Sequence, residues 1–322
     1  MKTKFLLLLA VGLGLGVFSQ DVNLVPTTDN GQTVAQAAKK VKKVKKAKKV
    51  KRTKKTTATK ENGNSTKYAN QATDELTMAV AWYQTSSEAK ALYYQGYQTA
   101  TNNLKQALTK HSDKKLAVVL DIDETVLDNS PTEGTQIIQH VGYPTGWHDW
   151  VLSAQAKAVP GAREFLNYAD HNGVDIYYVS DRDANTELSA TEENLRNQGL
   201  PQANPDHIIL KTPSMTSKQT RRDEIEKTHN VVMYVGDNLT DFNDPSESTV
   251  DGRNADVEQN KDKFGTQYII LPNPMYGGWE SALYAGHGTL TAKDKINLRK
   301  QHITYFDYKT KTLKQVKVAN IK

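Results

Sequence analysis

Two pairs of aspartates in this sequence stand directly after short apolar runs. Asp121 and Asp123 follow the run LAVVL, with one isoleucine between them. Asp237 and Asp241 follow the run VVMYVG. Side chains two residues apart in an extended chain point to the same side, so Asp121 and Asp123 should share one face. If the two runs are neighbouring strands, four carboxylates meet in one crevice, where they repel one another unless a cation or protons neutralise them.

Phosphoryl transfer is the chemistry that such a carboxylate group supports. The chain has no cysteine, which excludes thiolate zinc sites and thiol mechanisms, and oxygen ligands alone favour a hard cation such as Mg²⁺. One aspartate can attack phosphorus to form an aspartyl phosphate, while a second carboxyl protonates the leaving oxygen and then activates water. The metal neutralises the phosphate charge.

A phosphate also needs donors from the protein. Ser180 follows another apolar run and offers a hydroxyl, although it could instead cap the next helix. Lys218 stands at the predicted start of a helix, where its ammonium adds to the positive helix end, and Lys211 is the alternative cation there. The sequence contains no Arg-His-Gly motif, no Gly-x-Ser-x-Gly elbow and no P-loop, which excludes the chemistries that those motifs carry.

The elements that must position these residues alternate between two patterns. Continuous apolar runs predict buried strands, and the segments between them have the apolar spacing of helices. The predicted strands are 116–120, 174–179, 207–210, 231–235 and 267–271, and the predicted helices include 160–173, 186–199 and 217–229. The alternation predicts an α/β fold with a parallel sheet covered on both faces, whose ligands bind beyond the carboxyl ends of the strands.

The segment before the first strand is predicted to be helical. Apolar residues at intervals of three and four over 68–108 indicate two helices, broken near Thr85–Glu88, where Ser86 or Ser87 can cap the second.

The domain expected from these patterns covers 67–322. It consists of a helical N-terminal part over 68–110 and a core over 116–290. The segment 301–322 alternates as strands do, and no role is assigned to it.

The motifs resemble the four-part pattern of the haloacid dehalogenase superfamily. The pattern runs through DIDET from Asp121, then Ser180 and Lys218, and ends in GDNLTDF from Gly236. Within that superfamily, VVLDIDETVLDNSP, VVMYVGDNLTDF and LPNPMYGGWE are similar to the class C bacterial acid phosphatases, the lipoprotein e 5'-nucleotidase family, in subfamily IIIB. The resemblance implies a Rossmann-like core with a parallel sheet and a small helical cap.

The resemblance also implies roles for the aspartates. Asp121 would be the nucleophile and Asp123 the general acid and base. Asp121, the main-chain carbonyl of Asp123 and Asp237 would bind Mg²⁺, with Asp241 supporting the metal site.

Contacts with the substrate are implied in the same way. Ser180 and Lys218 would hold the phosphate. Tyr276 would pack against the nucleoside of a substrate, and Trp147 or Trp150 would line the cap.

The sequence departs from the family pattern in two places. Thr132 stands where the family usually has an aromatic residue, which removes part of a base-stacking surface and leaves the nucleotide preference open. The cysteine that carries the family's lipid is absent, so we expect no lipid anchor.

The N-terminus resembles a secretion signal. Lys2 and Lys4 precede fourteen apolar residues, Phe5–Phe18, which as a helix would span about 21 Å, less than a bilayer core. We therefore expect residues 1–37 to hold a signal peptide and pro-region with an open cleavage site, and the mature protein to be secreted or associated with the cell surface without a transmembrane span.

A lysine-rich arm is expected over 38–66. Its segment Lys39–Lys55 has twelve Lys and Arg in seventeen residues, with a period of three that fits neither helix nor strand, so we expect disorder. Subtracting this +12 from the net +6 leaves −6 for the rest of the chain. We expect the arm to bind anionic cell-surface polymers. Nonspecific nucleic-acid binding and a plain linker are the alternatives, and no specific nucleic-acid partner is expected.

The predicted function is that of an exported, Mg²⁺-dependent acid phosphatase acting on small phosphomonoesters, with 5'-nucleotides as one candidate class. A phosphotransferase, in which another alcohol replaces water, is one alternative. A non-catalytic surface-binding protein with the same fold is another, but such a protein has no need for four mutually repelling aspartates.

Overall fold

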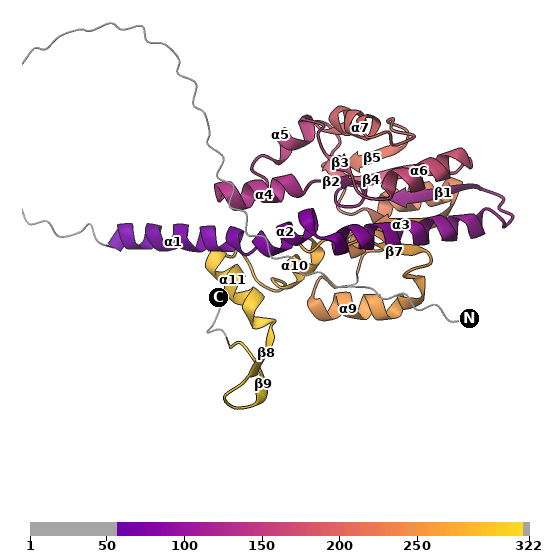
Figure 1. Cartoon of the computed structure of the whole chain (residues 1–322). Coiled ribbons are helices and arrows are strands. Elements are labelled where there is room, and N and C mark those ends of the chain that lie inside the picture. Colours follow the sequence, from indigo (N-terminus) through magenta and orange to yellow (C-terminus); the bar gives the residue numbers. More distant parts are fainter. Residues whose placement is uncertain (1–56, 246, 318–322) are drawn as a thin grey trace, which may run out of the picture. The chain divides into compact units, whose positions relative to one another are not determined.

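The computed structural model describes residues 57–245 and 247–317 (Figure 1). Its centre is a five-stranded sheet in the order β5-β4-β1-β6-β7, and each neighbouring pair is parallel. The strands are β1 (Lys115–Leu120), β4 (Asp175–Asp183), β5 (Ile208–Lys211), β6 (His229–Gly236) and β7 (Tyr268–Ile270). The predicted α/β fold with a parallel sheet is confirmed, and β1, which leads into Asp121, is the central strand.

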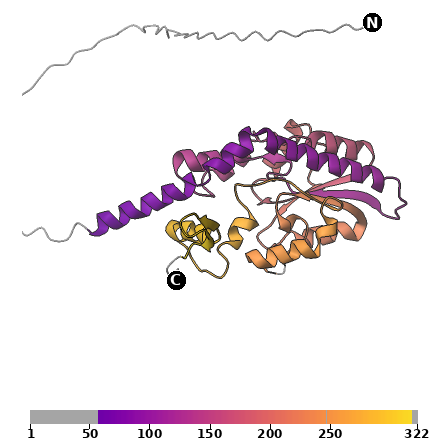
Figure 2. The ribbon, with the colours of Figure 1, turned by 60° about the horizontal axis from the view of Figure 1, so that its bottom comes forward.

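The two faces of β1 pack against different groups of side chains. Val118 and Leu120 belong to a core that includes Phe165 of α6 (Ala162–His171). Ala117 and Val119 face the opposite core, which includes Ile225 of α8 (Gln219–Thr228). Because both faces are buried, β1 is a continuous apolar run rather than an alternating one. Figure 2 shows the sheet between its helices.

Helices fill the connections between the strands. They include α7 (Leu188–Asn197) and α9 (Val250–Gln259), and the short 3-10 helices η1 (Leu239–Asp241) and η2 (Lys261–Lys263) follow β6 and α9. The predicted helices over 160–173, 186–199 and 217–229 correspond to α6, α7 and α8, each a few residues shorter than predicted.

Three helices precede the sheet, where the sequence predicts two. They are α1 (Thr57–Asp74), α2 (Thr77–Thr85) and α3 (Ser87–Ala107). The predicted break is confirmed, because the Ser86 hydroxyl caps α3 by accepting from Ala89 N at 3.0 Å. The additional break follows a turn in which Leu76 N donates to the Thr73 carbonyl at 3.1 Å.

The first helix also changes one expected boundary. α1 begins at Thr57, so residues 57–66, which the sequence assigns to the disordered arm, are helical. The predicted signal segment 1–37 and the rest of the predicted arm lie outside the described residues.

A small cap lies between β1 and α6, as the resemblance implies. It consists of β2 (Leu127–Asp128), α4 (Ser130–Gln139), α5 (Trp147–Leu152) and β3 (Lys157–Ala158), with β2 and β3 paired antiparallel.

The C-terminal part of the described chain adds α10 (Gly278–Ala282), α11 (Ala292–Gln301) and a hairpin of β8 (Thr304–Asp307) and β9 (Thr312–Gln315). The hairpin accounts for the strand-like alternation near the C-terminus. Among the helices that the structure describes, none is long and apolar enough to cross a membrane.

Candidate active site

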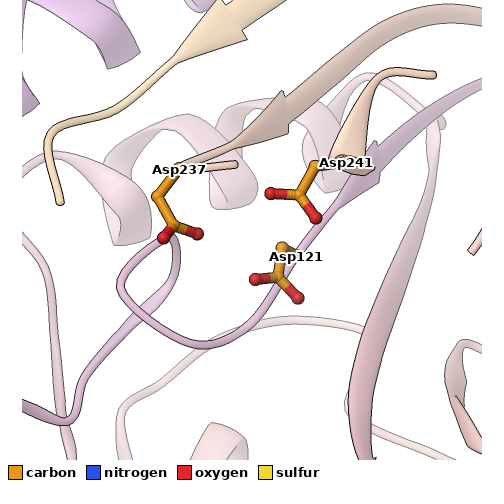
Figure 3. A group of neighbouring side chains, drawn as sticks. All are labelled: Asp121, Asp237 and Asp241. Carbon is orange, nitrogen blue, oxygen red and sulfur yellow. The ribbon is translucent and has the colours of Figure 1, made fainter. Parts of the chain in front are cut away.

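Three of the four predicted aspartates meet at the carboxyl edge of the sheet. Asp121 follows β1 and Asp237 follows β6, and Asp121 N donates to the Val235 carbonyl at 3.0 Å. One carboxylate oxygen from each of Asp121, Asp237 and Asp241 lies within 4.8 Å of the other two. Figure 3 shows the three carboxyl groups turned toward one another. The predicted convergence of the two acidic runs is confirmed for these residues.

The loop after β6 is shaped to bring Asp241 back to the sheet. Asp241 Oδ2 accepts from Asn238 N at 2.9 Å and thereby caps η1. A Cβ on Gly236 would lie 2.3 Å from the Asp241 side chain, so only glycine fits at the end of β6. The run GDNLTD is therefore required as much for this close turn as for its carboxylates.

A buried ammonium bridges two of the carboxylates. Lys218 Nζ lies 2.5 Å from Asp121 Oδ1 and 2.6 Å from Asp241 Oδ1. Burial disfavours the charged form of Lys218, but these two carboxylates outweigh it and hold its pKa well above the ordinary value. The Lys218 side chain therefore stays charged and neutralises part of the cluster. The alternative cation, Lys211, instead lies 3.9 Å from Asp181.

Burial and mutual repulsion disfavour the ionised forms of these carboxylates. Burial raises the pKa of Asp121 well above its ordinary value; Lys218 opposes this rise, and Asp241 and Asp237 add to it. Burial, followed by the charge of Asp241, raises the pKa of Asp237 to about 7. Folding thus brings three carboxylates together with too little neighbouring positive charge to keep all of them ionised at their ordinary pKa.

Two neighbours hold the third carboxylate in place. Asp237 Oδ1 accepts from Thr125 Oγ1 at 3.2 Å, and Asp237 Oδ2 accepts from Asn273 Nδ2 at 2.8 Å. A cluster of fixed, oxygen-only ligands with excess negative charge fits a hard divalent cation.

Asp123 lies in a different environment, although it is only two residues from Asp121. Its Oδ1 accepts from Arg182 Nε at 2.9 Å and from Asn129 Nδ2 at 2.8 Å, and Arg182 Nη2 lies 2.8 Å from the same oxygen. Its Oδ2 accepts from Ser180 Oγ at 3.1 Å. The structure therefore brings Asp123 to the same edge but directs its side chain to a cation and amide rather than to the other three aspartates.

The family of the chain follows from comparison with known proteins. The family model described as HAD superfamily, subfamily IIIB (acid phosphatase) matches residues 35–279. The chain belongs to this family. It is an acid phosphatase, and the buried cluster of carboxylates is compatible with the divalent metal that phosphatases of this superfamily generally use.

Solved structures agree with this assignment. The class C acid phosphatase from Bacillus anthracis is 46% identical in sequence, with a TM-score of 0.71, and the match covers 73% of this chain and 99% of that chain. A second structure of the Bacillus anthracis enzyme, with tungstate bound, matches with a TM-score of 0.70 at the same identity and the same coverage.

A cavity of about 940 Å³ opens over the phosphatase carboxylates. Asp121, Asp123, Asp237, Asp241 and Lys218 all line it. Two predicted substrate residues, Tyr276 and Trp147, line it as well. The two tryptophans differ in their contacts, because Trp150 instead donates from Nε1 to Asn129 Oδ1 at 2.8 Å.

Ser180 lies beside the site but is fully buried. Its hydroxyl donates to Asp123 Oδ2 and accepts from Arg182 N at 3.2 Å. In this structure the Ser180 hydroxyl holds Asp123, and its role in phosphate binding stays a prediction.

Glu124 connects the loop after β1 to the substrate residues. It is fully buried with φ +55°, and its carboxylate accepts from Asn129 N at 2.7 Å and from the Tyr276 hydroxyl. The Tyr93 hydroxyl of α3 donates to the Glu124 carbonyl at 2.5 Å. Tyr276 is thus fixed by its hydroxyl end, which leaves its ring as the part available to a substrate.

Three polar residues of the site are absent from the sequence prediction: Arg182, Asn129 and Asn273. Arg182 stands two residues after Ser180, which the sequence places at a strand end, and this position is the one signal that could have singled it out. Asn129 and Asn273 contact aspartates that are distant in sequence or across a turn, and nothing local to them indicates these partners.

Proposed function

We propose that this acid phosphatase hydrolyses small phosphomonoesters with Mg²⁺ through an aspartyl phosphate on Asp121. The observation that carries the proposal is the buried group of Asp121, Asp237 and Asp241, whose oxygens lie within 4.8 Å of one another and face a cavity. Such a group is stable with a bound cation and offers a carboxylate nucleophile beside it.

Mg²⁺ would be held by Asp121, Asp237 and the main-chain carbonyl of Asp123, with Asp241 as a supporting carboxylate. When bound, the metal supplies positive charge that offsets the charge of the substrate's phosphate. Thr125 and Asn273 keep Asp237 oriented before the metal arrives. Such outer contacts commonly set metal affinity.

Asp121 is the proposed nucleophile. Lys218 holds its Oδ1, which fixes the orientation of the carboxylate toward the cavity. As the attacking oxygen bonds to phosphorus, the bond from phosphorus to the leaving oxygen breaks, and Asp123 gives that oxygen a proton. Asp123 then takes a proton from water, which attacks the phosphorus and frees Asp121. Lys218 and Ser180 are the proposed donors to the phosphate oxygens.

The proposed substrates are small phosphomonoesters, and 5'-nucleotides are a candidate class. Support comes from the rings of Tyr276 and Trp147, both of which line the cavity. Thr132 lies on α4, where its hydroxyl donates to the Asn129 carbonyl at 2.9 Å. Because its side chain has no aromatic ring, it offers no stacking surface. A nucleobase would therefore rely on Tyr276 and Trp147.

Export and surface retention form a separate part of the proposal. The first residues have the pattern of a secretion signal, and Lys39–Lys55 carries the charge to bind anionic polymers. Cells washed with increasing salt should release the full-length protein. A variant without Lys39–Lys55 that stays as firmly attached would contradict this role for the arm.

The test of the central proposal is phosphate release from several phosphomonoesters, including 5'-nucleotides, with and without Mg²⁺. Asp121→Asn should lower kcat by at least about 10⁴-fold, because the amide is not a nucleophile. Asp128→Asn is the control, since the Asp128 carboxylate accepts from Ser130 N within its own turn at 2.9 Å. Full activity in Asp121→Asn, with mass spectrometry excluding deamidation, would contradict the mechanism. An added alcohol that collects the phosphoryl group would indicate a phosphotransferase.

A further inference from the structure

Arg182 is a buried cation on the Asp123 side of the site. It comes from β4, two residues after Ser180, and is 2% exposed. Burying a guanidinium is costly unless each of its polar atoms finds a partner. The position of Arg182 beside a proposed catalytic group therefore requires an explanation.

The guanidinium of Arg182 is already occupied by protein acceptors. Nε donates to Asp123 Oδ1 at 2.9 Å, and Nη1 donates to Thr191 Oγ1 at 3.1 Å. Nη2 lies 2.8 Å from Asp123 Oδ1 and donates to Asn129 Oδ1 at 3.3 Å. With all three nitrogens engaged, Arg182 is arranged to hold side chains rather than to grip a phosphate.

The two oxygens of Asp123 are held unequally. Oδ1 lies within hydrogen-bond distance of three nitrogens, two from Arg182 and one from Asn129. Oδ2 has one such contact, from the Ser180 hydroxyl. The Asp123 side chain is 16% exposed and lines the cavity, so part of the carboxyl faces the space where a substrate binds.

We propose that Arg182, together with Asn129, is a positioning residue that fixes Asp123 through Oδ1 and presents Oδ2 to the leaving-group oxygen. This inference rests on the proposed role of Asp123 as general acid. Arg182 touches neither the phosphate nor the metal in this account, and it acts through the orientation of one carboxyl group.

The surroundings of Arg182 make this orientation rigid. Trp150 Nε1 donates to Asn129 Oδ1 at 2.8 Å, so the amide that holds Asp123 is itself fixed by the cap. The Trp147 ring lies 5.8 Å from the Arg182 guanidinium carbon, in a cation–π arrangement. The cap helix α5 thus supports the general acid as well as lining the cavity.

The leaving group provides a test that a merely structural role would not pass. The leaving alcohol of an alkyl phosphate needs a proton, whereas the aryl oxide of an activated aryl phosphate leaves readily without one. We would measure kcat/KM with glycerol 2-phosphate and p-nitrophenyl phosphate at saturating Mg²⁺, using the full chain. The ratio of the two values reports general-acid catalysis and is insensitive to the amount of folded enzyme.

The expected changes in that ratio separate the variants. Asp123→Asn should lower the alkyl-to-aryl ratio by about 100-fold or more, which is the typical contribution of a general acid. Arg182→Met should lower it by about tenfold or more, and Arg182→Lys by less, because lysine keeps one donor for Oδ1. Thr191→Val is the matched control, since it removes a contact of Arg182 that does not reach Asp123; it should leave the ratio unchanged.

Two results would overturn the inference in different ways. Equal losses with both substrates in Arg182→Met, together with a selective loss in Asp123→Asn, would show that Arg182 acts elsewhere and leave the proposed function intact. The absence of a selective loss in Asp123→Asn would remove the general-acid role and the inference with it. If thermal unfolding shows that Arg182→Met does not fold, Arg182→Lys and Asn129→Ser decide by the same ratio.

Discussion

Asp121 and Asp123 are separated by one residue, yet they lie in opposite electrostatic environments. Asp121 shares its place with two further carboxylates and one ammonium, and its pKa is raised by burial against the opposing effect of Lys218. Asp123 faces the guanidinium of Arg182 and the amide of Asn129, which lie on strand β4 and in the cap. The Asp121 side of the site has one ammonium for three carboxylates, whereas on the Asp123 side one guanidinium faces one carboxylate.

This difference indicates a division of roles at one sheet edge. A group of carboxylates with excess negative charge favours the binding of a cation, and the bound cation in turn favours the binding of phosphate. A carboxyl held by fixed donors gains a defined orientation, which is what proton transfer requires. The residue type is the same on both sides, so the neighbours determine the proposed role.

Removing the metal is expected to give the largest effect. Dialysis against a chelator should lower phosphatase activity by more than about 10³-fold, and added Mg²⁺ should restore it. Asp237→Asn should raise the Mg²⁺ concentration for half-maximal activity by about tenfold or more. Asp123→Asn keeps the main-chain carbonyl, so its residual activity should show an almost unchanged Mg²⁺ requirement.

Titration of Mg²⁺ against activity checks this contrast between the two sides. Asp128→Asn serves as the control, because Asp128 lies in a turn of the cap. An equal shift of the Mg²⁺ requirement in Asp237→Asn and Asp123→Asn would contradict the division of roles.

Replacing the ammonium should give an intermediate effect. Lys218→Met leaves Asp121 and Asp241 buried without their cation, so we expect a loss in kcat of about 10²- to 10³-fold. Without Mg²⁺ the free energy of unfolding should fall by about 3–5 kcal/mol. Because Mg²⁺ can replace part of the missing charge, the rise in Tm on adding Mg²⁺ should be larger in this variant than in the unmodified protein.

Thermal unfolding with and without Mg²⁺ measures that response. Lys211→Met is the matched control, since the Lys211 ammonium lies 3.9 Å from the Asp181 carboxylate, whereas the ammonium that bridges Asp121 and Asp241 is that of Lys218. An identical Mg²⁺ response in Lys218→Met and Lys211→Met would show that the ammonium and the metal do not share one charge cluster.

The smallest effect concerns Glu133, which lines the cavity away from the three aspartates. The carboxylate that acts on it most is that of Glu280. Burial, followed by the charge of Glu280, raises its pKa from 4.5 to about 7. Between these values the folded chain retains a proton that the unfolded chain has released, so Glu133 costs stability as pH rises through this window. Glu133→Gln should therefore match the unmodified protein near pH 4.5 and be more stable by up to about 3 kcal/mol at pH 8.

Chemical denaturation at both pH values tests this sign. Glu164→Gln, on the exposed side of α6, is the control and should change little at either pH. A Glu133→Gln variant that gains its stability at the lower pH would contradict the raised pKa.

Much of the fold can be predicted because local patterns determine it. The strands are continuous apolar runs since both faces of the sheet are buried, and Ser86 marks a helix start through its own side chain. The break after Asp74 could not be predicted, because no glycine or proline marks it. The predicted strand over 174–179 also ends too early. β4 continues through polar residues to Asp183, which pairs with Lys211 after a register shift.

The site divides in the same way. Asp121, Asp237 and Asp241 could be placed together because each follows a strand, and parallel strands end at one edge. The contact of Asp123 with Arg182 joins residues 59 apart, and it depends on how the loop after β1 lies against the end of the neighbouring strand β4. Asn129 and Trp150 are paired for the same reason. Pairings of this kind depend on tertiary packing and leave no mark in a local pattern.

Trapping the phosphorylated enzyme tests the central claim most directly. Asp123→Asn should form the aspartyl phosphate from p-nitrophenyl phosphate but hydrolyse it slowly, because the base for water is missing. Acid quenching, reduction with borohydride and peptide mapping should then find homoserine in place of Asp121 alone. Homoserine at another aspartate, or an unmodified Asp121 during a burst of p-nitrophenol, would contradict the account.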